Sequence, residues 1–123
     1  MVETLLVMAG GAMGSALRYW CGVGATRLFG PSFPVGTLLI NIVGSFVLAF
    51  LTGLGGGLAV GARARLLLGT GFCGGFTTFS TFSVESLALI ERGDHGLAAL
   101  YLAGSLLGGL AGGWLGLAVA RLR

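Results

Sequence analysis

The sequence has few charged side chains and contains no lysine. Charged residues make up 9% of the 123 residues, whereas an ordinary soluble domain carries about 25%. Hydrophobic residues account for 55% of the chain, and a chain this short has too little interior to hide that much apolar surface from water. We therefore expect a lipid bilayer to receive most of these side chains.

Residues that usually bind metals or perform catalysis are also scarce. The two cysteines, Cys21 and Cys73, lie in apolar segments without a CxxC pattern, and His95 is the only histidine. The sequence shows no nucleophile–base pair, no metal-ligand cluster and no phosphate-binding loop, so we predict that the protein is not an enzyme. The arginines are scattered rather than clustered, which argues against a nucleic-acid partner.

Turn-forming residues divide the chain into four apolar segments. The breaks fall at Pro31 and Pro34, at the glycine-rich run 53–57 and at the polar run 91–95. Each segment is long enough to span a bilayer, which takes roughly 20 apolar residues, and short connections favour antiparallel neighbours. We predict an all-α integral membrane protein that forms one transmembrane domain over 1–123. The expected transmembrane helices are 3–24, 35–54, 65–90 and 96–120.

Glycine is unusually frequent, with 25 residues. Gly104, Gly108, Gly112 and Gly116 recur every four residues and so form one ridge of the last predicted helix. In membranes such ridges let helix backbones approach closely. The ridge predicts a helix contact, either within the chain or between subunits.

The arginines are divided almost evenly between the two predicted sides of the membrane. One side carries Arg63, Arg65, Arg121 and Arg123, and the other carries Arg27 and Arg92, with Arg18 added if it lies near the surface. The positive-inside rule then favours termini inside the cell only weakly. Such a weak bias is what insertion in both orientations requires.

The third segment contains a sequence poorly suited to a continuous helix. Gly74 and Gly75 are followed at once by Thr77 and Thr78, which predicts a break at 74–78, near Gly74–Thr77. Irregular backbone at this depth is tolerated only beside protein or an aqueous cavity, and its carbonyl oxygens can coordinate a cation. The alternative is an unbroken helix with a glycine packing face.

Phenylalanines and hydroxyl-bearing residues alternate after this break. The positive ring edges of Phe79 and Phe82 can attract a small anion. Hydroxyls such as that of Ser80, together with the amide of Asn41 in the second segment, can replace the water that an anion loses. This pattern predicts an anion path. The alternative is that the rings fill space and that Asn41 makes an interhelical hydrogen bond.

A few further polar residues lie inside the predicted helices. Intramembrane charges are costly and often functional, which makes Arg18 and Glu85 candidates, although each is also compatible with a solvated position near a helix end. Tyr101 and Ser105 are four residues apart on the last helix. They either line a path or bond to a neighbouring helix.

Three segments together resemble a known family. The run Gly-Phe-Cys-Gly-Gly-Phe-Thr-Thr-Phe-Ser-Thr-Phe-Ser at 71–83 closely resembles the third-helix signature of the Fluc (CrcB) fluoride channels. The segments Gly-Ala-Met-Gly-Ser-Ala-Leu-Arg-Tyr at 11–19 and Gly-Thr-Leu-Leu-Ile-Asn-Ile-Val-Gly-Ser-Phe at 36–46 agree with its first two helices. The resemblance covers nearly the whole chain in order.

This resemblance implies a passive fluoride-selective channel that lowers cytoplasmic fluoride. It further implies an antiparallel homodimer with dual topology in the inner membrane of a bacterium, with a structural sodium ion at its centre. The backbone carbonyls that match the sodium site are those of Gly74 and Thr77. Arg18 and Glu85 match charges near the pore mouths. The positions implied for the fluoride pathway are Asn41, Phe79, Ser80, Thr81, Phe82, Tyr101 and Ser105.

Two other functions compete with this one. A proton-coupled efflux transporter of the small multidrug resistance type also has four helices in an antiparallel dimer, but it relies on a carboxylate embedded in its first helix. Here that helix carries only Glu3, at its start. A structural subunit of a larger complex would explain the glycine ridge, but it leaves Asn41 and the phenyl–hydroxyl run unexplained.

Overall fold

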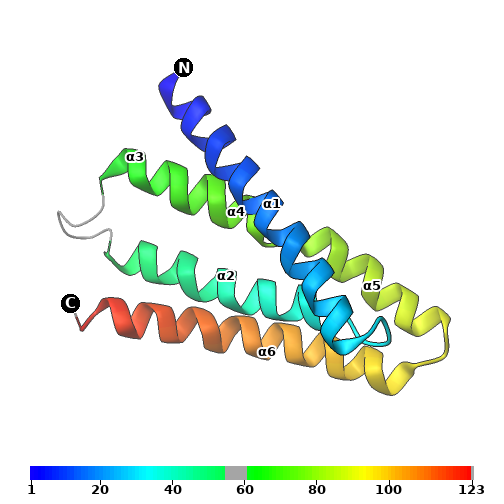
Figure 1. Ribbon diagram of the computed structural model, residues 1–123. Coiled ribbons are helices and arrows are strands. Elements are labelled where there is room, and N and C mark those ends of the chain that lie inside the picture. Colours follow the sequence, from blue (N-terminus) through cyan, green and yellow to red (C-terminus); the bar gives the residue numbers. More distant parts are fainter. Residues whose placement is uncertain (55–60, 123) are drawn as a thin grey trace.

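The computed structural model describes residues 1–54 and 61–122, and within them every regular element is helical (Figure 1). The elements in chain order are α1 (Val2–Phe29), α2 (Val35–Leu54), α3 (Ala62–Arg65), the π-helix η1 (Leu66–Cys73), α4 (Gly74–Phe76), α5 (Phe79–Glu91) and α6 (His95–Ala120). The predicted all-helical fold is confirmed for this part of the chain. Residues 55–57 of the glycine-rich run, and Arg123, lie outside the described residues.

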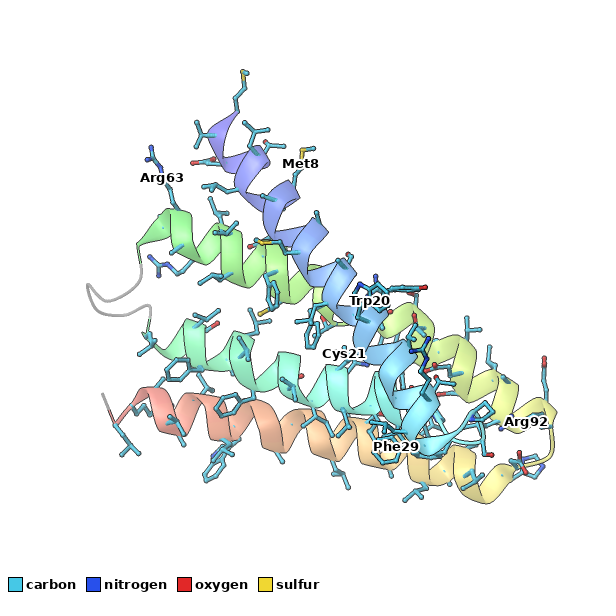
Figure 2. The ribbon with its side chains drawn as sticks, in the orientation of Figure 1. Met8, Trp20, Cys21, Phe29, Arg63 and Arg92 are labelled. Atoms are coloured by element: carbon cyan, nitrogen blue, oxygen red, sulfur yellow. The ribbon has the colours of Figure 1, made fainter. Side chains whose placement is uncertain are left out.

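Two helices, α2 and α6, are long and apolar enough to cross a membrane. Only 17% and 6% of their most apolar stretches are buried inside the protein, so most of the side chains there lie wholly or partly at its surface. Large apolar side chains elsewhere do the same, as Met8 does where it projects from α1 (Figure 2). This exposed apolar surface indicates a membrane protein.

Several ends of the helices differ from the predicted bounds. α1 continues past Gly24 to Phe29 and ends at Gly30, whose φ of 78° suits glycine. α6 begins at His95, so this residue opens a helix rather than lying in the loop predicted at 91–95. The third helical segment begins at Ala62 rather than at Arg65.

The glycine ridge of α6 packs along α2, and the two helices lie side by side in Figure 1. A Cβ added at Gly108 would meet the side chain of Ile42 at 2.6 Å, and one added at Gly112 would meet the Ile42 carbonyl oxygen at 2.9 Å. A Cβ at Gly116 would overlap the Phe46 carbonyl oxygen. The ridge therefore makes a helix contact within the chain.

α1 crosses η1 and α4 at an equally close contact. Gly10 and Gly14 are the buried residues of α1, and a Cβ at either would overlap backbone atoms of η1. From the other side, a Cβ at Gly75 would lie 2.5 Å from the Gly11 carbonyl oxygen. These contacts fix the helix that leads into the break.

The third segment leaves the helical conformation at Thr77 and Thr78. Thr77 has φ −78° and ψ 157°, and Thr78 has φ −151° and ψ 115°, which are extended values. Gly74 is still helical, with φ −62° and ψ −38°. The break thus lies at the far edge of the predicted segment, because close packing of Gly75 against Gly11 of α1 holds the residues before Thr77 in a helix.

Candidate functional site

The extended residue Thr78 is held by the side-chain amide of Asn41 on α2. The Thr78 backbone N–H donates to Asn41 Oδ1 at 2.8 Å, and Asn41 Nδ2 donates to the Thr78 carbonyl oxygen at 3.0 Å. A residue that leaves a helix at this depth needs such partners, because buried unpaired backbone groups are costly. The amide uses one of its two Nδ2 hydrogens in this bond, and the second can donate to another acceptor.

The Thr78 side chain forms the N-cap of α5 and gathers hydroxyls around it. Its Oγ1 accepts from the Thr81 backbone N–H at 3.2 Å and donates to Thr81 Oγ1 at 2.9 Å. Ser80 Oγ lies 3.3 Å away. Three hydroxyls therefore cluster at the positive end of the α5 dipole, where negative charge is favoured.

These same hydrogen bonds release two backbone carbonyls. In a continuous α-helix, Gly74 and Thr77 would receive bonds from the N–H groups four residues later, those of Thr78 and Thr81. Both of these N–H groups donate to side chains instead. Gly74 is exposed, and a Cβ there would meet nothing within 4 Å. Oxygen ligands of this kind suit a hard cation such as sodium, so the residues fit the predicted sodium site.

A groove of about 700 Å³ runs between α2, α5 and α6. Its lining includes Asn41, Thr78, Phe79, Phe82 and Ser105, and no charged residue. The Phe79 side chain is 80% exposed, and its ring centroid lies 5.8 Å from that of Phe82. Ser105 Oγ is buried and has no hydrogen-bond partner among the described residues. Such a hydroxyl calls for a water or a ligand. We name this surface the phenyl groove.

A second groove of about 690 Å³ lies between α1, α2 and α5. Arg18, Thr37, Thr78, Thr81 and Glu85 are part of its lining. Arg18 Nε is buried and has no hydrogen-bond partner in residues 1–54 and 61–122. We name this surface the arginine groove. Among the described residues, only Thr78 lines both grooves.

Tyr101 lines neither groove. It is completely buried, and its hydroxyl donates to Glu85 Oε2 at 2.7 Å. Thr37 Oγ1 donates to the other oxygen, Glu85 Oε1, at 3.0 Å. The Tyr101 ring packs between Phe82 and Phe33, with centroid distances of 5.2 and 5.6 Å. Tyr101 and Ser105 share α6, but the structure separates them: Ser105 faces the phenyl groove and Tyr101 faces Glu85.

The structure therefore brings most of the predicted site residues together around Thr78. Thr78 and Thr37 were not among them. Thr37 precedes Asn41 by four residues, so the two share a helix face, and this spacing is the signal that could have identified it. Thr78 occupies the position of an N-cap threonine before a helical run, which was a second available signal.

These features define a class: a small helical membrane protein in which two grooves, each lined by apolar and a few polar side chains, meet at a broken helix. The chain matches the family described as "CrcB-like protein, Camphor Resistance (CrcB)" over residues 5–117, and it belongs to that family. The resemblance stated from the sequence is thereby confirmed.

Relatives of nearly the same length support this assignment. The chain is 53% identical over 120 residues to a protein of Gloeobacter violaceus named "Fluoride-specific ion channel FluC", covering 97% of this chain and 96% of the relative. Proteins with the same name from Agrobacterium fabrum and Novosphingobium aromaticivorans are 48% and 47% identical, with 98% of each chain covered.

Proposed function

We propose that this protein is a fluoride-selective channel in a bacterial membrane that lets fluoride leave the cytoplasm passively. The observation that carries the proposal is the buried, unpartnered Ser105 hydroxyl in the phenyl groove, beside Asn41 and two phenyl rings. The names of the relatives support the same function.

The phenyl groove offers what a dehydrated fluoride ion needs. Fluoride binds water strongly, so its path must supply hydrogen-bond donors in place of the lost water. Ser105 has a free hydroxyl, Asn41 has a second Nδ2 hydrogen, and the edges of Phe79 and Phe82 are weakly positive. No cationic side chain among the described residues lines the groove, so the groove attracts the ion without holding it too tightly for release.

Beyond Thr78 the path continues along the arginine groove. The hydroxyls of Thr78, Ser80 and Thr81 lie at the start of α5, and Arg18 supplies a positive charge further along. Glu85 would repel an anion, but its two oxygens accept hydrogen bonds from Thr37 and Tyr101. These bonds hold the carboxylate in a fixed place at the edge of the route.

We further propose four membrane spans and an antiparallel homodimer with dual topology in the cell inner membrane. A groove open along its length needs a second surface to enclose an ion. Phe79 is 80% exposed and Leu106 is 63% exposed along the phenyl groove. A second copy of the chain would cover these side chains and close the path.

The dimer centre is the proposed place for a structural sodium ion. The carbonyl oxygens of Gly74 and Thr77 would hold it, since their usual helical donors bond to Asn41 and Thr78 instead. Exposure of Gly74 leaves room for the same residues of a second copy. When bound, sodium balances the negative ends of the freed carbonyl dipoles.

Fluoride efflux from proteoliposomes, followed with a fluoride electrode, tests the function. We expect rapid efflux with no pH gradient imposed. Efflux that requires a proton gradient would support the small multidrug-type transporter, and absence of efflux would refute the channel. The transporter is disfavoured because Glu3, the only carboxylate in α1, is exposed at the start of that helix and lines neither groove.

A further inference from the structure

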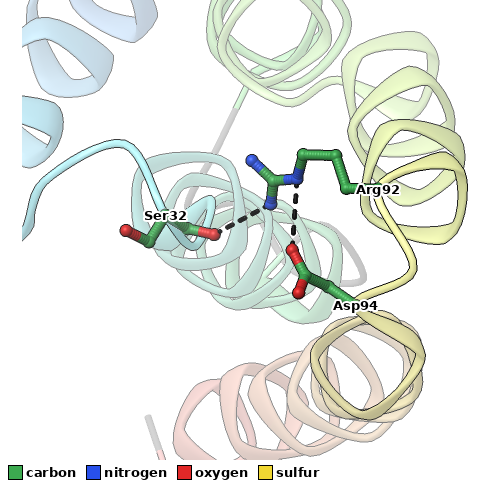
Figure 3. A network of polar contacts seen from close by, with 3 residues as sticks. All are labelled: Ser32, Arg92 and Asp94. Atoms are coloured by element: carbon green, nitrogen blue, oxygen red, sulfur yellow. Dashed lines mark hydrogen bonds and ion pairs between the residues drawn. The ribbon is translucent and has the colours of Figure 1, made fainter.

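A polar contact joins two turns at one end of the molecule (Figure 3). Arg92 Nη2 donates to the Ser32 carbonyl oxygen at 3.2 Å, and Arg92 Nε lies 3.2 Å from Asp94 Oδ2. Ser32 belongs to the turn between α1 and α2, and the other two belong to the turn between α5 and α6. We call this contact the turn clamp.

The residue next to the clamp reaches the buried tyrosine. Phe33 follows Ser32, and its ring meets Tyr101 edge-on, with the ring planes at 79°. Phe33 packs on the same buried cluster as Phe82, formed by Leu89, Ala98 and Tyr101. Since the Tyr101 hydroxyl donates to Glu85, a chain of direct contacts leads from Arg92 to Glu85.

The turn that carries Phe33 does not rest directly on Glu85. A cavity of about 240 Å³ lies there, lined in part by Pro31, Ser32, Phe33, Glu85 and Arg92. Packed interiors resist movement because side chains fill the space, so a turn over a cavity can shift more easily. The clamp restrains it across this gap.

We infer that the turn clamp and Phe33 position the Tyr101 hydroxyl on Glu85, which makes Arg92 and Phe33 positioning residues for ion conduction. The inference rests on the proposed function. The Tyr101 side chain is completely buried, and the rings of Phe82 and Phe33 both pack against its ring and restrain it. A displaced hydroxyl leaves the Glu85 carboxylate less restrained beside the arginine groove.

The turn clamp contributes little to the stability of the whole protein. The Arg92 and Asp94 side chains are 49% and 45% exposed, and exposed ion pairs contribute little to stability. Loss of Arg92 should therefore alter conduction far more than unfolding temperature.

The first experiment measures fluoride efflux from proteoliposomes for Phe33→Ala and Arg92→Gln. We expect a loss of roughly tenfold for Phe33→Ala, the lower end of the losses seen when outer supporting contacts are removed from other sites, and a smaller loss for Arg92→Gln. Phe33→Tyr should retain efflux, since it keeps the ring that packs on Tyr101. Phe29→Ala is the matched control, because Phe29 is exposed and contacts neither groove.

A double-variant comparison separates positioning from general packing. Tyr101→Phe keeps the ring and removes the hydrogen bond to Glu85. If Phe33 acts through that hydroxyl, Phe33→Ala causes no further loss in the Tyr101→Phe background. The same fractional loss in both backgrounds would overturn the inference, as would wild-type efflux in Phe33→Ala and Arg92→Gln.

A second readout does not depend on conduction. Tyr19 and Tyr101 are the only tyrosines, so ¹³Cζ-tyrosine NMR assigned with Tyr19→Phe follows the Tyr101 hydroxyl alone. We expect its resonance to shift in Phe33→Ala and to stay in place in Phe29→Ala. An unmoved resonance refutes the positioning role, whereas a wild-type protein that carries no fluoride refutes only the channel.

Discussion

Asn41 and Thr78 exchange two hydrogen bonds, of 2.8 and 3.0 Å, across the interface between α2 and the broken third segment. The Asn41 amide thus supplies hydrogen bonds that neighbouring turns would supply in a continuous helix. Both polar groups of a buried backbone unit depend on a single side chain, and that side chain also faces the phenyl groove.

Replacing Asn41 by Leu should cost both stability and conduction. Two buried backbone groups would lose their partner, and each unsatisfied group costs about 1–3 kcal/mol. We expect a lower thermal unfolding midpoint in detergent and no measurable fluoride efflux. Thr52→Ala is the control on the same helix, because the Thr52 hydroxyl only bonds back to the exposed turn at Leu48. Equal midpoints for Asn41→Leu and the wild type would contradict this role.

The two phenylalanines of the phenyl groove should tolerate isoleucine in folding but not in conduction. Isoleucine keeps an apolar side chain and removes the positive ring edge. We expect Phe79→Ile and Phe82→Ile to reduce fluoride efflux strongly while the proposed dimer persists in cross-linking or size-exclusion measurements. Phe82→Ile should also lower the unfolding midpoint, since Phe82 packs on Tyr101. Unchanged efflux in both variants would exclude the ring edges from the path.

Ser105→Ala should affect conduction without weakening the fold. The Ser105 hydroxyl is buried and bonds to no described residue, so its removal leaves no protein group unpaired. We expect slower fluoride efflux and an unchanged or higher unfolding midpoint. Ser86→Ala is the contrasting variant, because Ser86 donates to the Phe82 carbonyl at 2.7 Å and lines neither groove. A lower midpoint with normal efflux in Ser105→Ala would show that the hydroxyl serves the fold and not conduction.

Two alanine substitutions on α1 should have different effects on the free energy of unfolding. A Cβ at Gly14 would overlap the Phe72 carbonyl oxygen, whereas one at Gly24 meets nothing within 4 Å. We expect Gly14→Ala to destabilise by about 1–3 kcal/mol through overpacking. Gly24→Ala should be neutral or stabilising by up to about 1 kcal/mol, since alanine favours helices. Thermal unfolding measures both, and equal midpoints would argue against the close contact of α1 with η1.

Sodium should raise the unfolding midpoint of the proposed dimer. An ion bound only in the folded dimer stabilises it by mass action, and the carbonyls of Gly74 and Thr77 lack their usual helical donors. We expect a higher midpoint in sodium chloride than in potassium chloride or N-methylglucamine chloride at equal ionic strength. The same midpoint in all three salts would count against a sodium site.

The sequence predicted an all-helical chain and a break in its third segment, because both depend on local chemistry. Prolines and glycines at 30–34 stop one helix and start the next, and two adjacent threonines after a glycine pair disfavour a continuous helix. The exact place of the break could not be predicted from the third segment alone, because it depends on packing by another helix. Gly75 stays helical because α1 packs against it, and no single segment reveals its neighbour.

The candidate site was predicted only in part, because the contacts between segments cannot be seen in one segment alone. The spacing of Tyr101 and Ser105 places both on one side of α6, but it does not say which helix each one meets. Glu85 on α5 receives the Tyr101 hydroxyl, while α2 and the rings of α5 border Ser105. The π-helix η1 was not predicted, since its pattern of apolar residues does not differ from that of an α-helix.

Thr78 borders both grooves, caps α5 and binds Asn41 with its backbone. Because the two grooves share this residue, any substitution at position 78 alters both of them at once. Phe82 and Thr81 each border a single groove. Selection can therefore act on one groove without disturbing the other at these flanking positions, but not at Thr78.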